Sequence, residues 1–284
     1  MIKELKEILN KTYDNPILRQ TTVPLILTHP GCGKSQVIHE FAKERGVNMY
    51  TMILSQLMPG DVAGITMPDI KSRNMIICDS ELLLGLKDGD ILFIDECLTA
   101  LKQTLDAFLN LLQDRRLPSG KKLANIFIIA ASNPQGMPNL SPAIKQRFIM
   151  YDLKFNAEEY QKYLKDKYGM PEVVSKNLSI LIGKEKFESA TWNYTTPRSL
   201  EKAINQIGCE LPSPYDDILL PFLKHEIVLE NSYADLNYKK GDKIEYLTVL
   251  KTIIKKRNEV VTVKPTAKTK KTKVTKEELT LEQA

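Results

Sequence analysis

A short glycine-rich segment between an apolar run and a helical pattern constrains the fold of this chain more than any other feature. The apolar run, Val23 to Leu27, predicts a buried strand, and apolar positions from Val37 onward recur at helical spacing. A loop between a strand and a helix points backbone N–H groups inward and adds the positive end of the helix dipole. The segment therefore predicts a site for an anionic phosphate group. Its residues are Thr28-His29-Pro30-Gly31-Cys32-Gly33-Lys34-Ser35.

Each residue type in this segment suits one part of a nucleotide triphosphate. Gly31 and Gly33 let the backbone approach phosphate without a Cβ clash, and Lys34 can reach the β- and γ-phosphates. The Ser35 hydroxyl can ligate Mg²⁺. The pattern G-x-x-x-x-G-K-[ST] has glycine where Thr28 stands, and a Gly-Lys-Ser triplet alone could also be a solvated turn. The candidate residues for binding the triphosphate are His29, Pro30, Gly31, Cys32, Gly33, Lys34, Ser35 and Gln36.

Two further apolar runs end in polar side chains that would complete such a site. Ile91–Ile94 predicts a buried parallel strand that ends at Asp95 and Glu96. We expect Asp95 to hold Mg²⁺ together with the serine of the loop, and Glu96 to polarise the attacking water. Residues 126–131 predict a neighbouring strand, after which Asn133 can orient that water. A capping role before a proline is the alternative for Asn133.

The charge of the chain is concentrated near its C-terminus. The 284 residues carry a formal net charge of +5, but residues 251–284 hold ten basic and four acidic side chains, so the preceding part has a net charge of −1. Residues 264–273 are rich in lysine and poor in apolar side chains, which predicts a disordered tail. A solvated tail is the favoured interpretation, and an arm that binds nucleic acid or a partner protein is the alternative.

Composition also limits the class of protein. A hydrophobic content of 43% is ordinary for a folded chain with a core. No stretch approaches the roughly 18 apolar residues that span a bilayer, so we expect a cytoplasmic protein that binds no membrane. The four scattered cysteines and three histidines argue against disulfides, a zinc site and Ser-His-Asp catalysis. We interpret Cys32 as a small residue tolerated in the loop rather than a redox-sensitive thiol.

The order of the patterns predicts an α/β core followed by helices. Strand and helix patterns alternate up to about residue 155, and an irregular insertion at 59–90 contains residues 74–77, which could form one arm of a hairpin. We place later helices near 157–168, 171–183, 196–207, 213–230 and 242–257. The predicted organisation is a three-layer sandwich with a parallel sheet at 1–155, an all-helical lid and C-terminal helices at 156–258, and a tail at 259–284.

The motifs occur in the order typical of AAA+ ATPases, and the chain resembles the MoxR-like and dynein-related branch of that family over about residues 20–207. Besides the phosphate loop and the strand that ends at Asp95 and Glu96, the resemblance rests on five blocks: Asp61-Val62-Ala63-Gly64, Phe108-Leu109-Asn110-Leu111-Leu112-Gln113-Asp114, Ala131-Ser132-Asn133-Pro134, Ile144-Lys145-Gln146-Arg147-Phe148 and Thr196-Pro197-Arg198-Ser199-Leu200. The chain reads Pro142-Ala143-Ile144-Lys145 where relatives often read Glu-Ala-Gln-Leu-Asp. The resemblance implies a P-loop NTPase sandwich with an AAA+ helical lid.

The resemblance also implies roles for single residues and an assembly. Asn133 corresponds to the family's sensor 1, Arg198 resembles sensor 2, and Arg147 resembles the arginine finger that one subunit inserts into its neighbour's site. Arg115 and Arg116 are alternative fingers, and ion pairs remain the alternative role for all these arginines. A finger that acts in trans requires a homo-oligomeric ring, and the family resemblance implies six subunits.

Three functions are compatible with these features. MoxR-like relatives use ATP hydrolysis to remodel or activate partner proteins, often ones with a von Willebrand A-type domain, and this chaperone role is the first hypothesis. The alternative is a nucleic-acid-stimulated ATPase, a loader or translocase that uses the basic tail or pore loops. A scaffold that binds ATP without hydrolysing it is the third hypothesis, and Glu96 argues against it.

Overall fold

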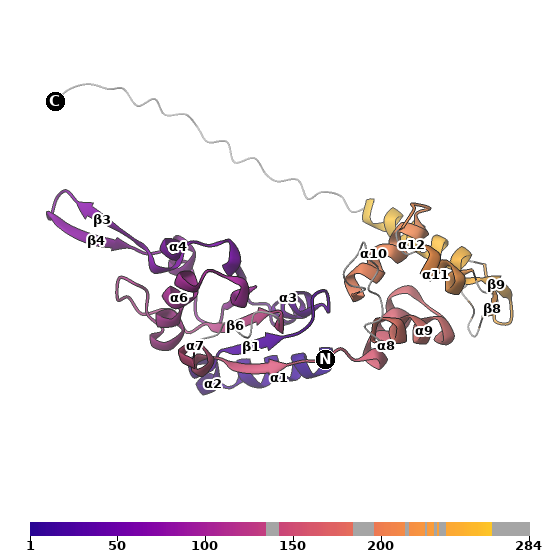
Figure 1. The fold of residues 1–284 in the computed structure, drawn as a ribbon, viewed down its shortest axis with the longest axis horizontal. Helices are drawn as coiled ribbons and strands as arrows, with labels where there is room; N and C mark the ends of the chain where they lie inside the picture. The colour runs from indigo at the N-terminus through magenta and orange to yellow at the C-terminus, as the bar shows by residue number, and fades with distance from the viewer. Residues whose placement is uncertain are drawn as a thin grey trace, which may run out of the picture. The chain divides into compact units, whose positions relative to one another are not determined.

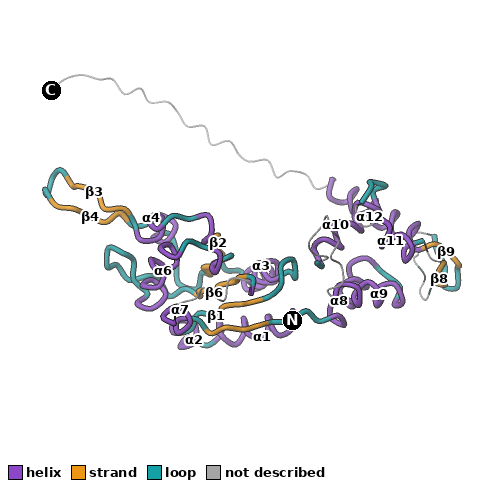
Figure 2. The backbone as a smooth tube through the Cα atoms, in the orientation of Figure 1, coloured by secondary structure: helices purple, strands orange, loops and turns teal. Residues whose placement is uncertain are grey.

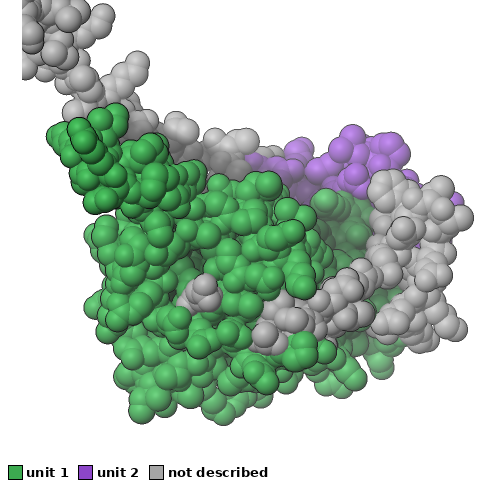
Figure 3. Space-filling model, turned by 60° about the vertical axis from the view of Figure 1, so that its left-hand side comes forward, with its two compact units in different colours: residues 1–204 green, residues 205–284 purple. Residues whose placement is uncertain are grey.

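The structure is a computed structural model that describes residues 1–134, 142–183, 196–213, 216–224, 226–229, 232 and 237–262. The chain divides into two compact units, Met1–Ile204 and Asn205–Ala284 (Figure 3). The boundary between them falls inside helix α10 (Pro197–Gly208). The domain limits at residues 155 and 258 stay predictions, and the lysine-rich segment 264–273 lies outside the described residues.

Five parallel strands form the central sheet, in the order β2-β5-β6-β1-β7. Figure 1 shows two of them, β6 and β1, side by side. Every residue of β1 and β6 is buried, as are the first four residues of β5, which explains why these segments read as unbroken apolar runs. The predicted parallel α/β sandwich is therefore confirmed. The strands are β1 (Pro24–Leu27), β2 (Met49–Ile53), β5 (Ile91–Asp95), β6 (Phe127–Ser132) and β7 (Ile149–Asp152).

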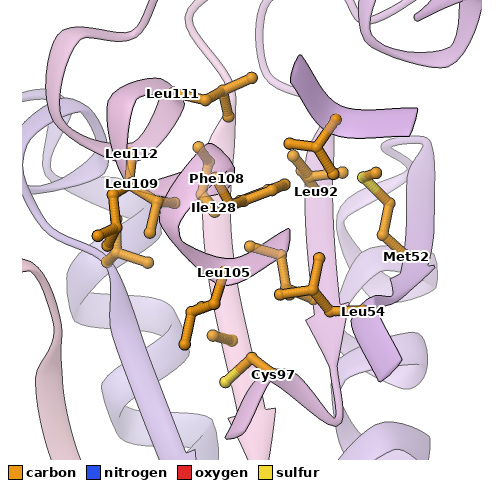
Figure 4. Close-up of a cluster of buried hydrophobic side chains, with 14 of the residues drawn as sticks. Met52, Leu54, Leu92, Cys97, Leu105, Phe108, Leu109, Leu111, Leu112 and Ile128 are labelled. Atoms are coloured by element: carbon orange, nitrogen blue, oxygen red, sulfur yellow. The ribbon is translucent and has the colours of Figure 1, made fainter. Parts of the chain in front are cut away.

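Helices cover both faces of the sheet because successive strand residues point to opposite faces. Phe93 packs in an apolar cluster with side chains of α1 (Ile2–Asp14) and α3 (Lys34–Arg45). Its neighbour Leu92 packs in a second cluster with side chains of α6 (Lys102–Asp114), where Figure 4 shows the two elements face to face. Two apolar layers thus hold the strands, and the carboxyl ends of the strands are free to carry polar residues.

Shorter elements connect these layers. The insertion between β2 and β5 contains an antiparallel hairpin of β3 (Ile65–Asp69) and β4 (Asn74–Cys78), which confirms the hairpin predicted there. Asn15 ends α1, and its side chain accepts hydrogen bonds from the first backbone N–H groups of α2, a short helix that the sequence did not predict. The other short elements are α2 (Pro16–Thr21), η1 (Leu54–Gln56), α4 (Pro59–Ala63), α5 (Glu81–Leu84), η2 (Cys97–Thr99) and α7 (Pro142–Arg147).

The remainder of the chain is mostly helical, with one difference from expectation. The helix expected at 213–230 ends earlier, and β8 (Glu226–Val228) pairs antiparallel with β9 (Lys243–Glu245). Ile227 pairs with Ile244 across these two strands, and β-branched residues favour strands over helices. The helices are α8 (Ala157–Tyr168), α9 (Glu172–Gly183), α10, α11 (Asp216–Leu223) and α12 (Tyr246–Thr262). Among the described helices, none combines the length and the apolar character that crossing a membrane requires.

Candidate nucleotide-binding site

The predicted site residues lie together at the carboxyl ends of three neighbouring strands of the sheet. In the register of the sheet, Leu27 in β1 pairs with Ser132 in β6, and Ile94 in β5 pairs with Ala130 in β6. The phosphate loop, Asn133 and Asp95 directly follow these positions. The sequence prediction that these groups meet at one edge therefore matches the geometry of the structure.

The loop itself has the backbone that its glycines allow. Gly31 and Gly33 have φ angles of +74° and +85°, in the left-handed region, and Gly33 is the N-cap of α3. Thr28, which departs from the motif, is buried, and its backbone N–H donates to the Ser132 carbonyl oxygen at 3.4 Å. Its hydroxyl donates to the His29 carbonyl oxygen at 3.1 Å. A threonine is thus accommodated here because both of its donors are satisfied locally.

Two hydrogen bonds join the loop to the neighbouring strand ends. The Lys34 ammonium donates to Asn133 Oδ1 at 3.2 Å, and the Ser35 hydroxyl donates to Asp95 Oδ2 at 2.9 Å. Burial lowers the pKa of the Lys34 ammonium, and the Asp95 carboxylate partly opposes this effect. A hydroxyl and a carboxylate in contact are oxygen ligands of the kind Mg²⁺ prefers, so this pair fits the metal ion that the sequence implies.

Glu96 has a partner that the sequence analysis missed. The Ser55 hydroxyl donates to Glu96 Oε2 at 2.6 Å, and Glu96 itself has a φ angle of +55°, which is unusual for a residue with a side chain. Ser55 lies two residues after the end of β2, whose carboxyl end is at the same edge of the sheet. A polar residue at the end of a predicted parallel strand is the signal that could have identified it.

The start of α10 lies directly on the phosphate loop. A Cβ atom added to Gly31 would come within 2.6 Å of Thr196 Oγ1 and 3.1 Å of Arg198 Cβ. The charge of Arg198 also contributes to the lowered pKa of Lys34. Arg198 is therefore beside the loop, as its assignment to sensor 2 requires, and Thr196 is a second neighbour that the sequence analysis did not single out.

Arg147 lies at the amino-terminal ends of the strands, and the phosphate loop lies at their carboxyl ends. It ends α7, just before β7, and Ile149 at the start of β7 pairs with Pro24 at the start of β1. The loop begins only after Leu27, and at about 3.3 Å per residue the intervening strand separates the two levels by roughly 10 Å. The Arg147 guanidinium donates through Nη2 to Gln113 Oε1 at 2.5 Å. The structure does not bring Arg147 together with the other predicted site residues of the same chain.

The two alternative arginines also lie near the amino-terminal ends of the strands, and they differ in burial. The Arg115 guanidinium is half-buried, donates through Nη2 to the Arg19 carbonyl oxygen at 3.5 Å, and has a pKa lowered to about 10 by burial. Arg116 is exposed, and its Nη1 donates to the Gly120 carbonyl oxygen at 2.9 Å. The geometry within one chain leaves Arg147, Arg115 and Arg116 as candidates for contact with a neighbouring chain.

Comparison with known sequences finds an AAA domain in about the first half of the chain. Residues 25–148 match the family profile of the AAA domain (dynein-related subfamily). Over 145 residues the chain is 29% identical to Protein NorQ of Paracoccus denitrificans (strain Pd 1222), and the match covers 47% of this chain and 53% of NorQ. The chain thus spans about half the length of this curated relative.

Solved structures support the fold. A RuvB point mutant of Thermotoga maritima superposes with a TM-score of 0.54 at 18% identity, covering 78% of this chain and 69% of that chain. The Thermotoga maritima RuvB Holliday junction branch migration motor gives a TM-score of 0.50 at 18% identity, covering 78% of this chain and 68% of that chain. At this identity the likeness shows the fold alone. The profile match over residues 25–148 and the similarity to NorQ support an AAA+ ATPase of the MoxR-like, dynein-related type.

Proposed function

We propose that this chain hydrolyses ATP with Mg²⁺. The observation that carries the proposal is the hydrogen bond between Ser35 and Asp95, because it joins the end of the phosphate loop to the acidic strand end at 2.9 Å. These are the two residues we assign to the metal ion, which when bound would neutralise charge on the phosphates. The match of residues 25–148 to the AAA domain supports nucleotide binding at the carboxyl ends of these strands.

The other residues at the edge take roles that suit their chemistry. Backbone N–H groups of residues 29–36 and the Lys34 ammonium bind the phosphates. Glu96 accepts a proton from the attacking water, and Asn133 orients that water. Arg198, on the helix that contacts Gly31, senses the nucleotide by closing α10 on the loop. Each assignment is a proposal that a single substitution tests.

We further propose that Arg147 acts on the site of a neighbouring chain in a homo-oligomeric ring of six. Its position at the amino-terminal ends of the strands supports action in trans, since it cannot contact the phosphate loop of its own chain without a large movement. Such a finger contributes about 10³–10⁵ to the rate of phosphoryl transfer. A heterologous contact that closes on itself gives a ring.

The work done by hydrolysis is, in this proposal, the remodelling or activation of a partner protein, including one with a von Willebrand A-type domain. Support comes from the similarity of the chain to the dynein-related AAA domain and to NorQ. The residues proposed for a nucleic-acid arm, 264–273, lie outside the described residues, so the alternative of a nucleic-acid-stimulated ATPase is left to experiment. A cytoplasmic location stays a prediction from the sequence.

The test is a comparison of the natural chain with the Glu96→Gln variant. We expect the natural chain to bind and hydrolyse ATP only with Mg²⁺, and the variant to bind ATP but turn it over at least about 100-fold more slowly. ATP-loaded Glu96→Gln protein should then retain a partner protein from the source cells. Stimulation of hydrolysis by DNA or RNA would favour the nucleic-acid alternative, and no binding of ATP would refute the proposal.

A further inference from the structure

A groove runs along the outer edge of β2. It has a volume of about 580 Å³ and is lined by three consecutive residues of that strand, Thr51 to Ile53. Successive strand residues point to opposite faces, so a cavity that touches three in a row follows the edge of the strand. β2 is the last strand of the sheet, and within the described part of the chain no backbone hydrogen bond reaches its outer edge. The groove therefore offers unpaired backbone N–H and C=O groups.

One face of the β3–β4 hairpin forms the opposite wall. Ile65, Met67 and Cys78 line the groove, and Ile65 pairs directly with Cys78 across the hairpin. Residues paired in this way share one face, so the groove-facing side of the ribbon is apolar. Met75 pairs with Pro68 on the other face and does not line the groove. The hairpin extends away from the layers of the sandwich (Figure 2), and Met67 remains 50% exposed.

The charged side chains of the groove are acidic. Among the described residues that line it, Asp61 and Asp79 carry charge and none is basic. Asp61 accepts from the Met58 backbone N–H at 2.8 Å, and Asp79 accepts from the Ser119 backbone N–H at 3.0 Å. These donors are neutral, and neither carboxylate forms an ion pair with a basic side chain in the part of the chain that the structure describes. An occupant with a lysine or arginine is favoured, and the phosphates of a nucleic acid are repelled.

We propose that this groove binds an extended segment of a partner protein, which adds as a strand to the free edge of β2. Backbone hydrogen bonds to β2 would give affinity, and alternate apolar side chains would pack against Ile65 and Met67. A lysine or arginine of the segment pairs with Asp61 or Asp79. The proposal names the kind of segment recognised, and in that respect it rests on the proposed partner-remodelling function.

The test starts from a library of random twelve-residue peptides displayed on phage and selected on the full chain. We expect the enriched peptides to alternate apolar residues and to contain a lysine or arginine. One enriched peptide is then labelled with fluorescein, and its binding is measured by fluorescence anisotropy. Methylation of every second backbone nitrogen of that peptide should weaken binding by about tenfold, because it removes strand hydrogen bonds.

Two matched variants of the chain separate the faces of the hairpin. Met67→Ser should weaken binding of the labelled peptide by about tenfold, and Met75→Ser by less than about twofold, because only Met67 lines the groove. Both variants should hydrolyse ATP at the rate of the natural chain. The failure of peptide binding with normal hydrolysis would overturn the groove alone, whereas peptide binding without hydrolysis would overturn the proposed function alone.

Three other results would also overturn the proposal. They are the absence of enrichment, the enrichment of acidic or proline-rich peptides, and equal weakening by the two methionine substitutions. Sedimentation velocity adds a fourth. If Met67→Ser changes the oligomeric state and leaves peptide binding unaltered, the groove is a contact between copies of this chain.

Discussion

The hydroxyl of Ser55 donates a 2.6 Å hydrogen bond to Oε2 of Glu96, the carboxylate that we assign as the base for hydrolysis. The serine hydroxyl occupies a carboxylate oxygen that could otherwise accept a hydrogen bond from the attacking water, so the bond competes with the proposed reaction. Ser55 belongs to the segment that follows β2, so the position of this segment controls the direction of the Glu96 carboxylate.

Replacement of Ser55 by alanine should therefore raise basal ATP hydrolysis. A net hydrogen-bond contribution of about 1 kcal/mol corresponds to a rate increase of about fivefold. Steady-state phosphate release measures it, with Ser72→Ala in the exposed hairpin turn as the matched control. A lower rate in Ser55→Ala would mean that Ser55 positions Glu96 for catalysis instead of restraining it.

The Lys34→Ala variant should lose nucleotide affinity. Lys34 is the half-buried ammonium of the loop, and removing its hydrogen bonds to charged phosphate oxygens should weaken ATP binding by about 100-fold or more. Isothermal titration calorimetry measures the affinity. Lys43→Ala is the control, because Lys43 is an exposed residue of the same helix α3. Equal affinity in the natural chain and Lys34→Ala would refute the phosphate-loop assignment.

Gly31→Ala should destabilise the fold because of the contact with α10. The added Cβ would lie 2.6 Å from Thr196 Oγ1, at a φ of +74°, so collision and backbone strain add to about 2–4 kcal/mol. Gly46→Ala, with a φ of +65° and open space around it, should cost only about 1 kcal/mol. Urea unfolding gives both values. Equal losses would show that α10 does not rest on the loop in solution.

Much of this site could be predicted from the sequence because strands that are buried on both faces have a simple signature. The runs ending at Leu27, Ile94 and Ala131 fixed three strand ends, and parallel strands end at one edge. Ser55 was missed because β2 is an edge strand with only Met52 buried, so its pattern is weak and its end is poorly marked. Thr196 was missed because its role comes from a contact across more than 160 residues.

The cysteines should divide into two reactivity classes. Burial raises the pKa of Cys97 to about 12, and the Asp95 charge adds to this. Burial also raises the pKa of Cys32, although Lys34 partly opposes the effect. At pH 8 a maleimide should therefore label the exposed Cys78 and Cys209 first, and the buried pair only on unfolding.

The same pKa shift predicts a loss of stability in alkali. An unfolded thiol ionises near pH 8.5, so the stability from keeping Cys97 neutral is complete below about pH 8.5 and is lost as pH rises toward 12. In the maleimide experiment, mass spectrometry of the labelled peptides gives the labelling rate of each cysteine. Fast labelling of Cys32 in the folded chain would instead support a redox-sensitive phosphate loop.

The Arg147→Ala variant tests whether the site is completed by a neighbouring chain. Arg147 lies at the amino-terminal ends of the strands, away from the phosphate loop of its own chain. The pure variant should therefore bind ATP normally, and its rate of hydrolysis should fall by about 10³-fold or more. Mixing it with Lys34→Ala should restore part of the activity. In mixed rings an intact loop from one chain can face an intact Arg147 from the other. Full activity of pure Arg147→Ala would assign the role to Arg115 or Arg116 instead. The Arg115 guanidinium is half-buried and has no carboxylate partner among the described residues, and Arg116 is exposed. Parallel alanine variants of these two arginines distinguish them.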